Sequence, residues 1–158
     1  MTVIIPHQDM ELKLINLQRK LIKAISSETS IFYESVPLWL PLPEELNCSS
    51  KEHLKNTARN IKSISLDNLK YNNKAIYIEG KLSFDHINGK KADYIISLPF
   101  ARLYSKSINT NPNIEEEMLK KISLEALPLS LKIFRLGIST NHGNNGTAIS
   151  DFVWVKLK

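Results

Sequence analysis

Two arginines stand among apolar residues in segments that favour strands, and a guanidinium in such a place is a candidate for binding an anion. Arg102 alternates with Phe100 along one segment, and Arg135 alternates with Ile133 and Gly137 along another. A charge on an apolar strand face needs a partner, because burying it unpaired is costly. We keep two alternatives: the arginines pair with carboxylates or reach the sheet edge, or they line a groove that binds an anion.

Two residues with hydroxyl groups extend this candidate site. Tyr104 continues the alternation of Arg102, and Ser130 precedes Arg135 in the same segment. We group them with the arginines as polar residues that a phosphodiester site could use. The predicted ligand-binding residues are therefore Arg102, Arg135, Tyr104 and Ser130, and we predict no catalytic residue.

The four histidines and the single cysteine form no pattern typical of a metal centre or a nucleophile. His7, His53, His86 and His142 are dispersed, so the paired spacing of zinc ligands is missing. Cys48 and His53 are five residues apart at a helix start, which does not orient a thiolate against an imidazole. We therefore expect neither a bound metal nor a cofactor.

Length and composition fit one ordinary domain over residues 1–158. Of the 158 residues, 42% are hydrophobic and 23% are charged, close to the globular average. No apolar run reaches the roughly 18 residues of a membrane-spanning helix. The first residues show no export signal, and the single cysteine cannot form an internal disulfide. We expect a cytoplasmic protein that does not contact a membrane.

The net charge of +5 comes from lysines scattered along the chain. Because these lysines form no run and no helical stripe, we attribute them to solubility and treat nucleic-acid binding as the alternative. Binding that weakens strongly with added salt would favour the alternative.

Three segments carry the apolar spacing of amphipathic helices. The first follows Asp9 and has apolar residues at intervals of three and four over residues 10–25. The second follows a capping-box signature at residues 49–52 and extends to residue 61. The third follows Asn113 over residues 114–126, with glutamates in its first turn, where the helix dipole favours negative charge. Each is expected to pack its apolar stripe on a sheet.

The strand signals are clearest in the middle and at the end of the chain. Residues 76–84 alternate between apolar and polar, Asn88-Gly89 favours a tight turn, and residues 94–98 follow, which predicts a hairpin. A strand around Ile64 and Leu66 extends it to a meander. Residues 129–139 and 148–157 predict a second hairpin, with residues 152–155 buried on both faces. Residues 2–6 and the proline-interrupted residues 30–42 add extended segments.

The order of these elements predicts the fold class. It reads strand, helix, strand, helix, three strands, helix and two strands, with short connections. We expect one α+β domain, in which about three helices pack on a mixed, mostly antiparallel sheet.

Residues 36–40 and residues 127–131 share a Pro-Leu-x-Leu core, and each segment follows a helix and opens a strand. With the element order and the closing hairpin, this placement resembles the 2H phosphoesterase superfamily, which includes the 2′-5′ RNA ligase-like proteins. The resemblance implies two lobes and a His-x-Thr or His-x-Ser motif on each of two central strands. The matching positions here are Leu38, Leu40, Leu129 and Leu131, which cannot carry a proton or donate to a phosphate. Chance recurrence in a leucine-rich chain is the other explanation.

Together these observations predict a non-catalytic binding or interaction module. On a 2H-like scaffold the family's active site would be absent, and the sheet cleft would bind a nucleotide, RNA or protein partner. The alternative is a small phosphodiesterase-type enzyme whose active site has moved to the four polar residues named above. Hydrolysis of cyclic phosphodiesters that is unchanged in Arg135→Ala would eliminate that relocated site.

Overall fold

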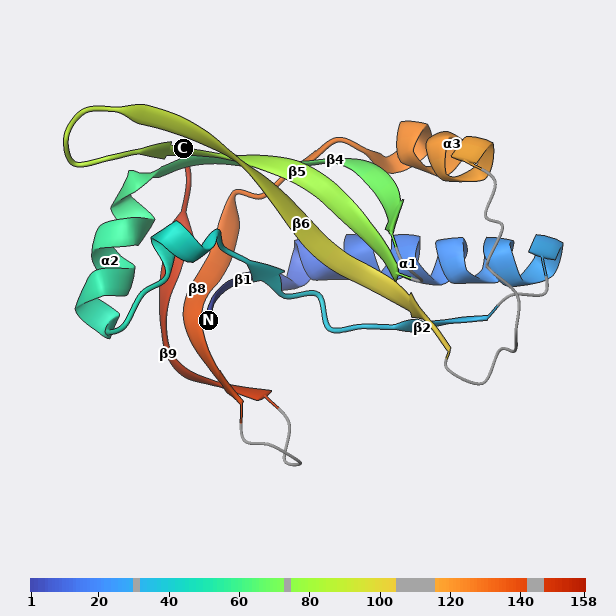
Figure 1. Cartoon of the computed structure of the whole chain (residues 1–158), viewed down its shortest axis with the longest axis horizontal. Coiled ribbons are helices and arrows are strands. Elements are labelled where there is room, and N and C mark those ends of the chain that lie inside the picture. Colours follow the sequence, from blue (N-terminus) through green and yellow to red (C-terminus); the bar gives the residue numbers. More distant parts are fainter. Residues whose placement is uncertain (30–31, 73–74, 105–115, 142–146) are drawn as a thin grey trace.

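The computed structural model describes residues 1–29, 32–72, 75–104, 116–141 and 147–158 (Figure 1). In chain order the elements are β1 (Thr2–Pro6), α1 (Gln8–Thr29), β2 (Tyr33–Ser35), β3 (Leu40–Pro41), the 3-10 helix η1 (Glu44–Leu46), α2 (Lys51–Asn60), β4 (Ile61–Asn72), β5 (Ala75–Asp85), β6 (Lys91–Leu103), α3 (Glu116–Ala126), β7 (Leu129–Ser130), β8 (Ile133–Asn141) and β9 (Thr147–Lys156). The three predicted helices and both predicted hairpins are present, which confirms the α+β class. The predicted cap at Asn113 and the turn that holds His142 lie outside the described residues.

The strands form two sheets rather than the one expected. Four strands lie in the order β3-β1-β8-β9, and five lie in the order β2-β6-β5-β4-β7. Every pairing among the described strands is antiparallel. The larger sheet is dominated by the predicted meander β4-β5-β6, whose long strands curve over α1 (Figure 1). The division into two sheets arises because β1 pairs with β8, from the other end of the chain.

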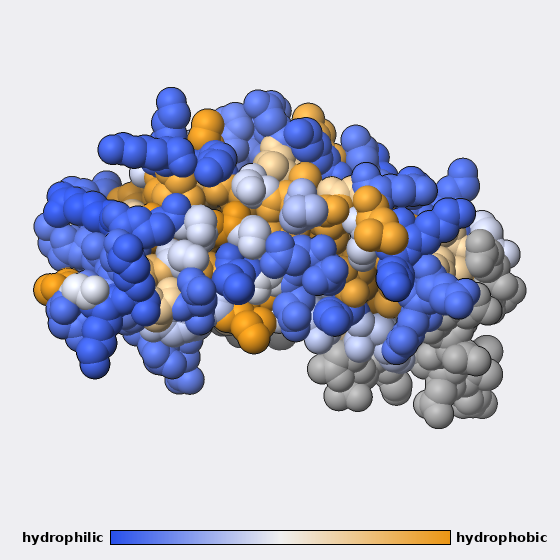
Figure 2. Space-filling view, turned by 90° about the horizontal axis from the view of Figure 1, so that it is seen from above, coloured by the Kyte–Doolittle hydropathy of each residue, from blue (hydrophilic) through white to orange (hydrophobic). Residues whose placement is uncertain are grey.

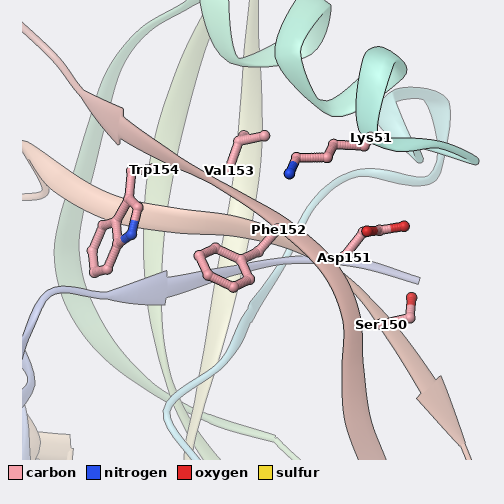
Figure 3. A pocket seen from close by; sticks show the side chains of 6 residues that line it. All are labelled: Lys51, Ser150, Asp151, Phe152, Val153 and Trp154. Carbon is pink, nitrogen blue, oxygen red and sulfur yellow. The ribbon is translucent and has the colours of Figure 1, made fainter.

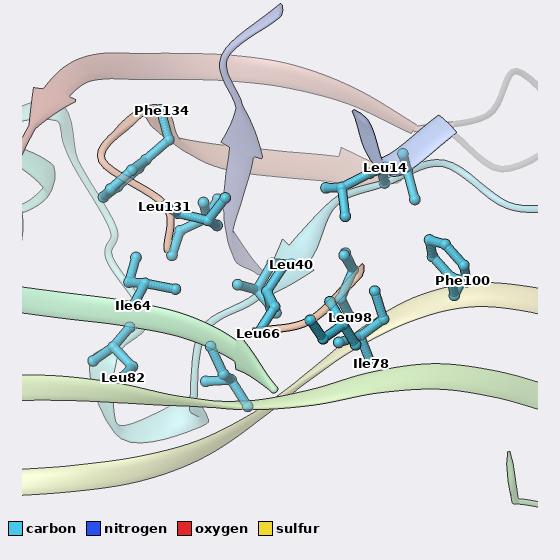
Figure 4. Packing of buried hydrophobic residues seen from close by; sticks show 14 of the residues in the cluster. Leu14, Leu40, Ile64, Leu66, Ile78, Leu82, Leu98, Phe100, Leu131 and Phe134 are labelled. Carbon is cyan, nitrogen blue, oxygen red and sulfur yellow. The ribbon is translucent and has the colours of Figure 1, made fainter. Parts of the chain in front are cut away.

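The core lies between the two sheets and α1. Figure 4 shows side chains of β4, β5 and β6 pointing toward Phe134 of β8 and Leu14 of α1. α1 buries its predicted stripe, since Leu14, Leu21 and Ile25 are all 0% exposed. Each such aliphatic side chain stabilises the fold by about 1.5–3 kcal/mol relative to an exposed one. None of the helices in the described part of the chain has the length and apolarity to cross a membrane.

The outer face of the five-stranded sheet is polar. Along β5, Ile78 and Leu82 are buried while Glu79 and Lys81 reach the opposite side. Figure 2 shows hydrophilic side chains standing over this sheet. Ile95 of β6 is exposed on this face, and Figure 2 shows further apolar side chains between the hydrophilic ones. This alternation is that of a sheet with one solvated face.

α2 lies beside β9 and contacts it (Figure 1). The predicted cap is Ser50, whose Oγ accepts a hydrogen bond from the His53 backbone N–H at 3.1 Å. The helix ends at Asn60, so that Ile61, predicted as its last turn, instead begins β4. A helix in this place covers the edge strand of the smaller sheet, which otherwise would offer unpaired backbone groups to another chain.

The two Pro-Leu-x-Leu segments lie at the edges of different sheets. Leu40 belongs to β3, the edge strand of the four-stranded sheet, whereas Leu129 and Ser130 form β7, the edge strand of the five-stranded sheet. The resemblance to the 2H phosphoesterases implies neighbouring central strands at these places. The observed arrangement gives that resemblance no support, and the family relationship stays a prediction.

Candidate functional site

The side of the four-stranded sheet that faces away from the core carries a row of large side chains. Arg135 of β8 is paired with Ile5 of β1 and with Trp154 of β9, and Gly137 is paired with Phe152. Paired residues of an antiparallel sheet point to the same side. We call this surface the aromatic face, and its residues are Val3, Ile5, Ile133, Arg135, Phe152 and Trp154.

Two β-branched residues of β1 form the floor of the aromatic face. Ile4 belongs to the core and is 0% exposed, so its neighbours Val3 and Ile5 point the other way. Val3 and Ile5 are nevertheless only 2% and 4% exposed. Larger side chains therefore close over them, and the aromatic face is a packed surface rather than an open strand face.

Arg135 is held between two aromatic rings. Its Cζ lies 5.4 Å from the ring centroid of Phe152 and 5.7 Å from that of Trp154. The two rings meet edge to face, with centroids 6.2 Å apart and planes at 87°. The two distances from Arg135 Cζ to the ring centroids are within the range of a cation–π contact. Within the described part of the chain, Arg135 contacts these two ring faces and forms no ion pair with a carboxylate, so the first of the two alternatives does not describe it.

The two rings remain open to solvent. Phe152 is 40% exposed and Trp154 is 61% exposed, so the prediction that residues 152–155 are buried on both faces is wrong. Only Val155, at 7%, is buried in the core, and Val153 packs against it. The reason is that α1 packs on the five-stranded sheet and α2 lies beside β9 (Figure 1), so neither helix covers the aromatic face.

His7 supports Trp154 from the end of β1. Its ring meets the indole edge to face, with centroids 6.2 Å apart. His7 Nδ1 accepts a hydrogen bond from the backbone N–H of Asp9 at 3.4 Å, and the Asp9 carboxylate lies 3.9 Å from the same nitrogen. Trp154 is thus fixed by contacts with three side chains although most of its surface is exposed.

A shallow pocket of about 410 Å³ follows β9 beside the two rings (Figure 3). Phe152 and Trp154 line one side, and Lys51 from the first turn of α2 reaches toward the strand from the other. Asp151 also lines this pocket. Lys156, two residues beyond Trp154, lies on the same side of β9 as the rings and is exposed. The aromatic face is therefore flanked by two lysine side chains and the Asp151 carboxylate.

The other predicted ligand-binding residues lie elsewhere. Arg102 and Tyr104 are at the end of β6 near the β2 edge of the five-stranded sheet, and Ser130 is on β7 at its opposite edge. Arg135 is in the other sheet. The structure therefore does not bring the four residues together at one place.

A bulge in β6 explains the position of Arg102. Ile76 of β5 pairs with Ala101 while the next residue pairs with Pro99, so Phe100 is an extra residue in the ladder. One extra residue reverses the side to which the following side chains point. Ala101 is consequently buried, and Arg102 is exposed, where it forms an ion pair with Glu34 of β2. The prediction of a carboxylate partner is confirmed for Arg102, but the apolar face assigned to it is wrong.

Within the described ranges, no group of three or more histidine, cysteine or carboxylate side chains could hold a metal ion. The thiol of Cys48 is buried and donates to Thr57 Oγ1 at 3.3 Å.

Sequence reasoning found Arg135 but missed Phe152 and Trp154. A signal was present, because both rings share one side of β9 with Lys156 while Val153 and Val155 occupy the other. Such strict alternation is typical of a strand with one solvated side, not of one buried on both. No protein-family model matches the chain, and comparison with curated proteins and with solved structures gives no significant match.

Proposed function

We propose that the protein is a non-catalytic module that binds single-stranded RNA in the cytoplasm through its aromatic face. The observation that carries the proposal is the pair of exposed rings, Phe152 and Trp154, with Arg135 held between them. Bases of a single strand stack on aromatic side chains without regard to sequence, and each stacked base contributes about 1–3 kcal/mol.

The spacing of the two rings suits neighbouring bases. Phe152 and Trp154 are two residues apart on one strand, which separates their attachment points by roughly 7 Å. Because the rings stand edge to face rather than stacked on each other, each keeps a separate surface for a base. Sheet-borne aromatic pairs of this kind are a common means of binding unpaired bases.

The charges of the aromatic face favour RNA over an apolar peptide. A peptide that covered Arg135 would remove water from the guanidinium without supplying an anion, which is costly. A phosphate supplies the anion and accepts charge-assisted hydrogen bonds from the same group. Lys51 and Lys156 flank the rings and add positive charge along the path of a backbone.

The enzyme alternative finds no favourable observation. A relocated phosphodiesterase site needs Arg102, Arg135, Tyr104 and Ser130 within reach of one scissile bond, and these residues are divided between two sheets. Binding at the aromatic face needs only Arg135 of this set.

Fluorescence anisotropy with a short labelled single-stranded RNA tests the proposal. Trp154→Ala is expected to weaken binding about tenfold or more, because a stacking contact is lost. Tyr71→Ala removes an exposed ring from the five-stranded sheet and serves as the matched control. It should leave the affinity unchanged.

Three results would contradict the proposal. They are the absence of saturable binding, an equal loss in the Trp154 and Tyr71 variants, and equal affinity for a duplex of the same sequence, whose bases cannot stack on the rings. Saturable binding of an apolar peptide in place of RNA would assign the aromatic face to a protein partner.

A further inference from the structure

A second pocket, of about 500 Å³, lies between α2, η1 and the end of the β5–β6 hairpin. In Figure 1 the turn of that hairpin lies above α2. Polar side chains from all three elements converge on this pocket, and its principal lining residues are Glu45, His53, Asn56, Asn60, Phe84 and His86. It shares no residue with the aromatic face.

One helical face of α2 forms a wall of this pocket. His53, Asn56 and Asn60 recur at intervals of three and four, so they lie on the same side of the helix. Leu54 points to the core instead and is 0% exposed. The two carboxamides each offer donors and an acceptor. Asn60 is half-buried, whereas Asn56 is exposed and its Oδ1 accepts a hydrogen bond from Arg59 at 3.5 Å.

A hydrogen-bond chain orders the opposite wall. His86 Nε2 lies 2.9 Å from Tyr94 Oη, and Tyr94 Oη donates to Glu45 Oε2 at 3.4 Å. Burial and the nearby Glu45 carboxylate raise the pKa of Tyr94, so the phenol keeps its proton. Because the Tyr94 hydroxyl donates its hydrogen bond to Glu45, the Tyr94 oxygen accepts one from His86 Nε2–H. In the neutral imidazole this leaves His86 Nδ1 as an acceptor. The ring of Phe84 packs on His86 with centroids 4.9 Å apart.

His53 supplies a donor on the helix side. The backbone N–H of Ser49 donates to His53 Nδ1 at 3.3 Å, which places the ring proton of the neutral imidazole on Nε2. The walls thus present a donor at His53 Nε2 and an acceptor at His86 Nδ1. They also present the carboxamides of Asn56 and Asn60, which can donate and accept. Arg59 donates to Asn56 at this pocket, but the described lining residues include the Glu45 carboxylate and no lysine or arginine, so the pocket is poorly suited to a phosphate.

We infer that this pocket binds a nucleobase. A base is uncharged, planar and bears donors and acceptors on one edge, which suits carboxamide and imidazole partners, and a neighbouring aromatic ring favours its flat surface. The choice of a base among neutral heterocycles rests on the proposed function, since RNA held at the aromatic face would bring bases to α2. The pocket would then read sequence, while the aromatic face supplies affinity without sequence preference.

An NMR titration of the ¹⁵N-labelled protein with adenosine, guanosine, cytidine and uridine tests the inference, because nucleosides carry no phosphate. At least one nucleoside is expected to shift the amides around His53, Asn56 and His86 in a saturable way. Asn56→Leu should weaken that nucleoside about tenfold, the usual effect of losing a paired contact to a base edge. Asn16→Leu, an exposed substitution in the middle of α1, is the matched control and should bind as the unmodified protein does.

The outcomes separate this inference from the proposed function. Nucleoside binding that survives Trp154→Ala, even if RNA binding fails, supports the pocket on its own. The inference is overturned if no nucleoside gives saturable shifts at the pocket, if Asn16→Leu loses as much affinity as Asn56→Leu, or if inorganic phosphate shifts the same amides.

Discussion

Arg135 keeps most of its capacity to bind an anion although both of its ring contacts are favourable. A cation–π contact at an exposed site contributes about 0.5–1 kcal/mol. A hydrogen bond to a charged group contributes about 1.5–3 kcal/mol. The rings therefore orient the guanidinium without satisfying it, and an incoming phosphate would gain more from Arg135 than the rings lose.

Gly80 occupies a position at which only glycine fits. It is paired with Leu66 on one side and Ile96 on the other, in the middle of the meander. A Cβ at this position would lie 1.9 Å from the backbone oxygen of Ser65, and a backbone atom cannot rotate away. Only glycine allows β4 and β5 to approach this closely.

Gly80→Ala is therefore expected to destabilise the fold by about 3 kcal/mol, the upper range for an inserted methyl group in a packed site. Gly89→Ala is the matched control, because Gly89 has φ +83° and open space around its Cβ position. That change should cost only about 1 kcal/mol of left-handed strain. Urea unfolding measures both, and equal losses would show that the close approach to Ser65 is not what Gly80 permits.

At the scale of elements, α1 is tied to the bulged part of β6 by one buried side chain. Gln18 is 3% exposed, and its amide donates to the carbonyl oxygens of Phe100 at 2.6 Å and Val36 at 3.1 Å. Phe100 is the extra residue of the bulge, where the ladder leaves a carbonyl without its regular strand partner. Gln18 thus stabilises both the bulge and the segment between β2 and β3.

Gln18→Leu should lower the free energy of unfolding by about 2 kcal/mol, because the buried carbonyl of Phe100 and the partly buried carbonyl of Val36 lose their donor. It should also accelerate hydrogen exchange of the amides at the end of β6. Asn16→Leu, on the exposed side of the same helix, controls for the added apolar side chain and should change stability by less than about 0.5 kcal/mol. Equal unfolding energies for the two variants would contradict this role of Gln18.

The same elements show what could be predicted from the sequence. The spacing of Leu14, Leu21 and Ile25 and the Asn88-Gly89 turn are local signals, and the structure confirms the helix and the hairpin that they predict. The bulge at Phe100 is not local, because it depends on contacts of β6 with β5 and Gln18. Without the bulge, the sequence pattern placed Arg102 on the apolar side of β6, which is wrong. Whether a helix covers one side of a strand also depends on long-range pairing. This decides how exposed Trp154 is.

At the scale of the whole molecule, the positive charge has two components that sequence cannot separate. Most of the lysines are scattered, as expected for solubility, and contribute a diffuse field. Arg135 and Lys156 lie on the β8–β9 hairpin, and α2, which is distant in the chain, brings Lys51 to the same surface. If the diffuse field bound RNA, any lost charge would matter equally. If the aromatic face binds RNA, only charges at that face would matter.

Salt dependence of RNA affinity distinguishes the two. With about three phosphate contacts, the logarithm of the association constant should fall with the logarithm of salt concentration with a slope of about −2, at roughly −0.7 per contact. Arg135→Gln should reduce the size of this slope by about 0.7, since one contact is removed. Arg102→Gln removes the same charge from the molecule, but at a site paired with Glu34 in the other sheet, so its slope should stay unchanged. Equal slopes in the two variants would mean that net charge alone attracts RNA, and the assignment of Arg135 as the contact would fail.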